Sequence, residues 1–218
     1  PLRAAAAPAA LDPGPLPGRA PPSGGPRAVV RRLAAAPYPE AMSDSPAAST
    51  SSSEAPRHRF DDGGQALSIA PLVRRFLPHL IEFRRDLHSH PELSYREHRT
   101  TDRLMTELEA VGLEPVRLRS TGCYVDIGTG ELSVALRADI DALPIQEATG
   151  LEFSSQNPGV AHMCGHDIHT TVMLGVATVL ADLNRTSPLS GRVRVVFQPA
   201  EEQLPGGALT VIEQDVLE

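Results

Sequence analysis

The sequence predicts an α/β layered domain with a mixed or mostly parallel sheet over residues 69–218. Segments with apolar residues at helical spacing alternate with short β-branched runs, as in layered α/β folds. One of these runs, "VRVVF", is almost continuously apolar, which is typical of a strand covered on both faces. Polar clusters follow the predicted strands, where α/β sheets bind their ligands.

The first element is an amphipathic helix that begins near Leu72. Its polar face carries arginines, and Pro78 predicts a bend or restart within it. Pro91 ends the pattern. The apolar face carries Leu72, Phe76, Leu80, Phe83 and Leu87.

A second helix and a set of alternating elements follow. In residues 96–113, Leu104, Leu108 and Val111 line one face, and Gly112 is typical of a C-terminal cap. The segment "IHTTVMLGVATVLADL" is apolar almost all round, which predicts a buried helix. The remaining expected elements are strands at 123–128, 132–140 and 191–202 and a helix beginning near 206.

The first 68 residues differ in composition from the rest. Residues 1–41 hold 10 of the 21 prolines and 12 alanines, and residues 43–53 read "SDSPAASTSSS". Such segments cannot bury enough apolar surface to offset their ordering entropy, so we predict a disordered, low-complexity segment over 1–68. The chain does not begin with Met, and Met42 precedes the Ser-rich stretch. We therefore expect residues 1–41 to lie upstream of a true start at Met42.

The composition limits which classes of partner and which cellular compartment we expect. A net charge of -7 argues against nucleic acid or an anionic membrane as a main partner, since both need a basic surface. No run of 18 apolar residues predicts a membrane span. Two cysteines, Cys123 and Cys164, form no disulfide framework, which favours a reducing, cytoplasmic location.

Three polar clusters are expected at strand ends or at a helix start. A metal ion would explain why acidic residues gather there, because neighbouring carboxylates repel unless a positive charge lies between them. The clusters are "RADIDALP" with Asp139 and Asp141, "HMCGHDIH" with Cys164, His166 and Asp167, and "PAEE" with Glu201 and Glu202.

The residue types suggest a division of roles. Of two adjacent glutamates, one can coordinate an ion while the other takes a proton from water. Cys164 and His166 are two positions apart, which suits chelation from an extended loop. Thiolate, imidazole and carboxylate together favour zinc, or manganese when oxygen dominates. Asp167 is expected to orient a ligand imidazole.

Simpler explanations remain open at this stage. A cysteine beside a helix is usually a small buried hydrophobe, and acidic residues often complement a helix N-terminus or form turns. Cys164 could also act as a thiol nucleophile with His166 or His169 as its base. Three other histidines are expected to be structural or surface residues: His88, His90 and His98. The same is expected of His162 and His169, although both stay candidates because they lie close to Cys164.

Four motifs carry a resemblance to a known family. From about Leu80, "RRDLHSHPELSYRE", "LRADIDALPIQE", "HMCGHDIHTTVMLG" and "FQPAEE" occur in the order found in the M20 metallopeptidase family. The chain resembles its amidohydrolase branch, which includes hippurate hydrolases, N-acyl-amino-acid amidohydrolases and auxin-conjugate hydrolases.

The resemblance implies a zinc-exopeptidase-like fold and a centre of two divalent metal ions, zinc or manganese. It implies that Cys164, His166 and Glu202 are metal ligands and that Glu201 is the general base. The implied reaction is hydrolysis of the amide bond of N-acyl amino acids or related conjugates.

The resemblance extends only to the N-terminal half of such an enzyme. No histidine follows His169, and the branch carries two further histidine ligands and a lid domain in its second half. A homodimer is expected only where the lid domain is present. The chain as given is therefore expected to be inactive, and a non-catalytic remnant stays an alternative.

Overall fold

The computed structural model describes residues 69–218. The predicted disorder of residues 1–68 and the start at Met42 lie outside the described residues. Within them, helices and strands alternate around a four-stranded mixed sheet, which confirms the predicted α/β class. None of the helices between residues 69 and 218 is long and apolar enough to cross a membrane.

Helices α1 (Ile69–Ser89) and α2 (His98–Ala110) open the domain. Of the bend or restart predicted at Pro78, the restart does not occur, because α1 runs through Pro78 as one helix. Its apolar stripe buries Phe76, Phe83 and Leu87. Helix α2 ends at Ala110, and the predicted capping glycine, Gly112, follows with φ +82° and donates its N–H to the Glu109 carbonyl at 3.0 Å.

The sheet contains β1 (Val116–Arg117), β2 (Cys123–Ile127), β3 (Ser133–Asp139) and β4 (Arg192–Gln198) in the order β1-β2-β4-β3. β4 pairs antiparallel with β2 and parallel with β3, and β3 forms one edge of the described sheet. In the parallel pair, Asp139 lies opposite Gln198. The C-terminal ends of these two strands therefore lie side by side at the same end of the sheet.

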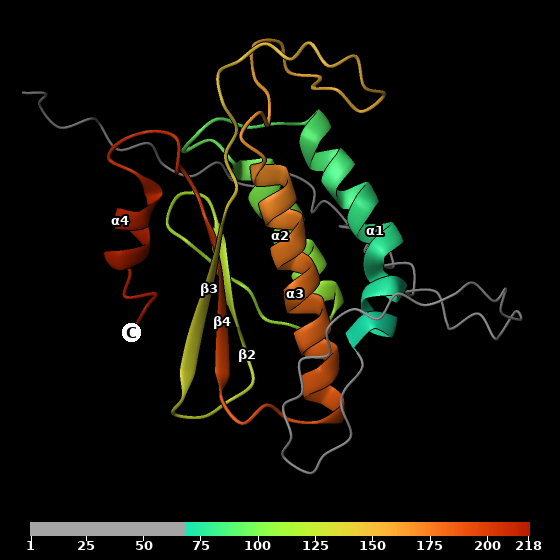
Figure 1. Cartoon of the computed structure of the whole chain (residues 1–218). Helices are drawn as coiled ribbons and strands as arrows, with labels where there is room; N and C mark the ends of the chain where they lie inside the picture. Colours follow the sequence, from blue (N-terminus) through green and yellow to red (C-terminus); the bar gives the residue numbers. More distant parts are fainter. Residues whose placement is uncertain (1–68) are drawn as a thin grey trace, which may run out of the picture. The chain divides into compact units, whose positions relative to one another are not determined.

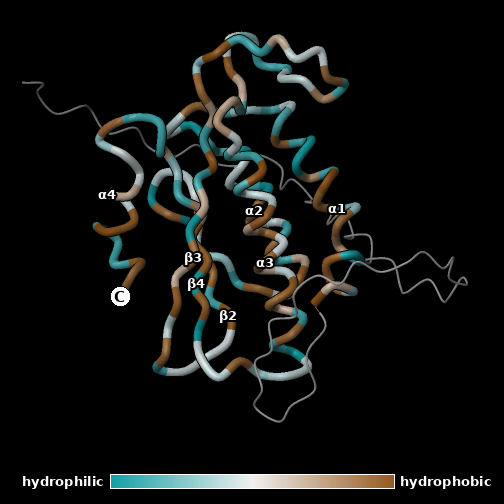
Figure 2. The backbone as a smooth tube through the Cα atoms, viewed as in Figure 1, coloured by the Kyte–Doolittle hydropathy of each residue, from teal (hydrophilic) through white to brown (hydrophobic). Residues whose placement is uncertain are grey.

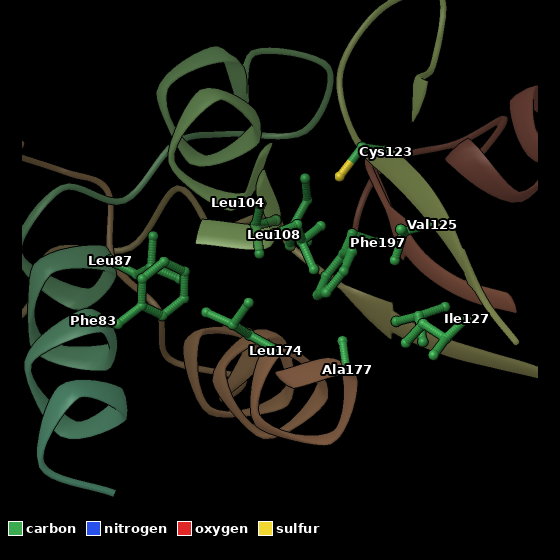
Figure 3. Close-up of a cluster of buried hydrophobic side chains, with 12 residues drawn as sticks. Phe83, Leu87, Leu104, Leu108, Cys123, Val125, Ile127, Leu174, Ala177 and Phe197 are labelled. Atoms are coloured by element: carbon green, nitrogen blue, oxygen red, sulfur yellow. The ribbon is translucent and has the colours of Figure 1, made fainter. Parts of the chain in front are cut away.

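The main core lies between the sheet and the three longer helices. Alternate residues of β2 and β4 face the helices, so Cys123 lies opposite Phe197 on this side. Figure 3 shows these side chains converging with Phe83 of α1, Leu108 of α2 and Leu174 of α3 (His166–Thr186). Hydrophobic residues in Figure 2 follow the strands and the inner helix faces.

The opposite face of the sheet is covered by α4 (Gly207–Ile212) and the residues after it (Figure 1). A smaller cluster forms there from Leu118, Val196, Val211 and Val216. Because β4 places Val195 on one face and Val196 on the other, it is covered on both sides. This agrees with its nearly continuous apolar sequence.

Helix α3 departs from the prediction of burial all round. Ile168 and Val172 are 49% and 59% exposed and line an apolar cavity of about 780 Å³ between α1 and α3. The rest of α3 is buried against the sheet, through Leu174 and Ala177, and against α1, where Gly175 lies next to Leu80.

Candidate metal centre

The two acidic clusters follow the parallel strands β3 and β4 and lie at the same end of the sheet. Asp139 ends β3, and Asp141 lies two positions further along the chain. Glu201 and Glu202 follow β4 after a turn at Ala200, whose φ is +49°. The two acidic segments that were expected at strand ends therefore lie close together in the structure.

The turn before Glu201 is held by a buried carboxylate. Glu97, fully buried at the start of α2, accepts hydrogen bonds from Ala200 N at 2.7 Å and from Thr121 Oγ1 at 2.6 Å. Burial is the main cause of its pKa being raised above the usual value. Glu97 thus fixes a backbone conformation that alanine rarely adopts.

The start of α3 supplies the third cluster. Cys164 precedes Gly165, which has φ +110°, and His166 is the first residue of the helix. The predicted extended loop was wrong, because this glycine turns the chain between the two side chains. They nevertheless reach one point: ligand atoms of Cys164, His166 and Glu202 all lie within 4.8 Å of one another.

His166 is the centre of the arrangement. Its Nδ1 donates to the Asp141 backbone carbonyl at 2.9 Å, which directs Nε2 towards the carboxylates. Nε2 lies 3.4 Å from Asp139, 3.9 Å from Glu201 and 3.7 Å from Glu202. One imidazole nitrogen therefore faces three acidic side chains.

The electrostatics of this site favour a cation. Burial lowers the pKa of His166, but hydrogen bonding to Asp141 and the charge of Asp139 outweigh it and raise the pKa to about 9. The pKa of the exposed Cys164 thiol is also raised, first by its hydrogen bond to Glu202 and then by burial and nearby carboxylates. Sulfur, imidazole and carboxylate donors in a strongly negative pocket suit a divalent ion such as zinc.

The residue that orients His166 is Asp141, and the prediction that Asp167 does so was wrong. Asp141 Oδ2 accepts from Ser94 Oγ at 2.6 Å and from Glu202 N at 2.9 Å, so it also ties the two strand ends together. Burial raises the pKa of Asp141, but hydrogen bonds from His166, Ser94 and Glu202 lower it to about 2. Asp167 instead contacts His88.

The structure adds His169 to the candidate ligands, because with Asp139 and His166 it forms a second possible ligand group. His88 and His162 were expected to be structural or surface residues, and they are buried. Within residues 69–218, neither ring nitrogen of His162 has a hydrogen-bond partner, and burial is the main cause of its pKa falling to about 4.

Comparison with known proteins gives a consistent picture. Residues 135–218 match the model of peptidase family M20/M25/M40. An N-acyl-L-amino acid amidohydrolase from Geobacillus stearothermophilus is 42% identical over 154 residues, which are 69% of this chain and 41% of that protein. A putative glutamate–cysteine ligase from Rhodococcus jostii is 54% identical over 142 residues, 64% of this chain but 17% of that protein.

A solved structure agrees with the sequence matches. A dinuclear metal-binding peptidase of the M20 family from Bacillus subtilis is 45% identical and superposes with a TM-score of 0.62, covering 66% of this chain and 41% of that one. The chain thus spans about two fifths of the amidohydrolase and of the solved peptidase. With its fold, its four motifs and its cluster at the strand ends, the chain resembles the N-terminal part of proteins of peptidase family M20.

Proposed function

We propose that residues 69–218 supply the first half of a metal-dependent amidohydrolase site, which cleaves the amide bond between an acyl group and an amino acid. The observation that carries the proposal is the convergence of Cys164, His166 and Glu202 within 4.8 Å, beside Glu201. The relationship to an N-acyl-L-amino acid amidohydrolase supports the substrate class.

Three side chains would hold a divalent ion: Cys164 through Sγ, His166 through Nε2 and Glu202 through its carboxylate. A bound ion of this kind polarises a carbonyl and acidifies water. Asp141 accepts the Nδ1 hydrogen of His166 and so leaves Nε2 free to bind. Two such ions, as in the dinuclear peptidase, would need further ligands, from regions like those of that peptidase that the match does not cover.

Glu201 would be the general base. Its side chain is 40% exposed, twice as much as that of Glu202 at 21%, so water and substrate can reach it. From beside the ligands, its carboxylate can take a proton from water and return it to the leaving amine. Adjacent glutamates thereby divide binding and proton transfer between them.

Two other activities fit less well. A thiol nucleophile needs a lowered pKa, whereas the carboxylates around Cys164 raise it. Ligase activity is not proposed, because the match covers 17% of the ligase-named protein.

Cobalt binding to the 218-residue chain tests the proposed ligands. We expect a thiolate-to-cobalt charge-transfer band in the wild type that is lost in Cys164→Ser, and weaker binding in Glu202→Gln. His98→Gln, a change at an exposed position, is the matched control. A cobalt spectrum that is the same in Cys164→Ser as in the wild type would contradict the ligand assignment.

The role of Glu201 is tested separately. Glu201→Gln in this chain should bind cobalt as the wild type does. The corresponding change in the complete Geobacillus amidohydrolase should abolish hydrolysis of N-acyl amino acids while its metal content stays the same. Retained turnover would refute the role of Glu201, and turnover that survives a chelator would refute the metal-dependent reaction.

A further inference from the structure

A largely buried cluster of charged side chains adjoins the candidate metal centre at the start of α3. We call it the His88 cluster, and it consists of Arg84, His88, Glu147 and Asp167. His88, in the last turn of α1, is 4% exposed, and Asp167 is fully buried. None of these four side chains has a role in the proposed chemistry, yet burying charged groups is costly unless they serve as partners for one another.

Each ring nitrogen of His88 faces a carboxylate. Nδ1 lies 2.8 Å from Asp167 Oδ2, and Nε2 lies 3.2 Å from Glu147 Oε1. Arg84 Nε also lies 2.7 Å from Asp167 Oδ2, and Arg84 Nη2 lies 3.3 Å from His88 Nδ1. Two basic side chains of α1 thus face two carboxylates.

The two carboxylates belong to segments that hold the proposed ligands. Asp167 follows His166 in the first turn of α3. Glu147 belongs to the connection 142–165, which carries Cys164 near its end, and it is fixed there by Ser155 N at 2.6 Å.

Other contacts attach the same connection to the end of α1. Gln156 N donates to the Ser89 carbonyl at 2.8 Å, and Asn157 Nδ2 donates to the Pro91 carbonyl at 2.7 Å. Figure 1 shows this connection extending beyond the ends of α1 and α3. The end of α1 therefore holds it at several points. His88 and Arg84 contact both the connection, at Glu147 and Phe153 respectively, and Asp167 of α3.

We propose that His88 is a positioning residue, which fixes the connection 142–165 against the start of α3 and so keeps Cys164 and His166 at ligand distance. The inference rests on the proposed function for its consequence, metal binding, but the contacts exist without it. His88 acts through Asp167 and Glu147 and touches neither Cys164 nor His166.

Hydrogen exchange on the metal-free chain tests the positioning. Glutamine ends in one amide group in place of a ring with a nitrogen towards each carboxylate, so His88→Gln cannot keep both contacts. We expect amide exchange at least about tenfold faster in the connection 142–165 and in the first turn of α3, with Val125 of β2 and Val195 of β4 unchanged. His98→Gln should match the wild type. Unchanged exchange in 142–165, or an equal increase everywhere, would overturn the proposal.

Cobalt affinity tests the consequence. Loss of a group that orients a ligand typically weakens metal binding 10–100-fold, and we expect a loss of about that size in folded His88→Gln. Wild-type affinity in that variant would overturn the positioning role. If the wild type itself bound no cobalt, the proposed function would fall, while hydrogen exchange would still decide the role of His88. Should His88→Gln not fold, Glu147→Gln, which removes one of the two contacts, is measured by the same two methods.

Discussion

Gly165 is the residue whose replacement most directly tests how the chain brings Cys164 and His166 together. It has φ +110° and ψ 16°, and a Cβ added there would meet nothing within 4 Å. Gly165→Ala therefore introduces no clash, and its whole effect is backbone strain of about 1–3 kcal/mol. The chain either keeps this strain or relieves it by rotating φ to a negative value. Rotation would move Cys164 away from His166.

A matched variant separates these effects. Gly159, in the same connection, has φ +77° and is equally open around its Cβ position. We expect both alanine variants to lower the free energy of unfolding by about 1–3 kcal/mol, measured by urea denaturation followed by circular dichroism. Only Gly165→Ala should also weaken cobalt binding, by about tenfold or more, because metal ligands tolerate displacements of only about 0.2 Å.

Two results would refute this reasoning. If Gly165→Ala were less stable but bound cobalt as tightly as the wild type, the ligand geometry would not depend on this turn. If it unfolded at the same urea concentration as the wild type, the positive φ would not be required at all. Weaker cobalt binding in Gly159→Ala would show that the effect is not local to the ligands.

Three further predictions concern stability and reactivity. Phe83→Ala should lower the free energy of unfolding by about 3–5 kcal/mol in urea denaturation, and Leu132→Ala, at an exposed position, by less than about 0.5 kcal/mol. The pKa of Glu147 lies at about 2 in the folded chain because hydrogen bonds from Thr149, Ser155 and His88 outweigh burial, which alone would raise it. Its contribution to stability is therefore present above its unfolded pKa near 4.5 and is lost as pH falls towards 2; the stability of Glu147→Gln, from urea titrations across this range, should lack that dependence. A thiol reagent should modify Cys164 alone in the folded chain, because Cys123 is buried with a pKa of about 12; modification of both thiols before unfolding would contradict this core.

Local pattern was sufficient to predict most elements. The helix face at Phe76, Phe83 and Leu87 and the strand beginning at Cys123 follow from periods of 3.6 and 2 residues, which report burial on one side. The spacing of apolar residues does not predict which part of the chain covers an apolar face. Helix α3 was therefore expected to be enclosed, although Ile168 and Val172 line an open cavity.

In the candidate site too, the sequence predicted some contacts and not others. Strand ends predicted that Asp139 and Glu202 approach Cys164 and His166, because adjacent parallel strands end at one edge. The partner of Asp167 could not be found from spacing, since His88 lies 79 positions away in the sequence. The turn at Gly165 was missed because a lone glycine does not reveal its φ.

The free edge of β3 affects how the protein behaves in a concentrated sample. This strand of seven residues, about 23 Å long, pairs with β4 on one side only among residues 69–218. Val134, within it, is 59% exposed. Helices shield the faces of a sheet and leave its edges open, and an open edge can hydrogen-bond to the same strand of another molecule. At low ionic strength, the mutual repulsion of chains with net charge -7 opposes such pairing. Salt screens this repulsion, so we expect association through the β3 edge to increase at high salt.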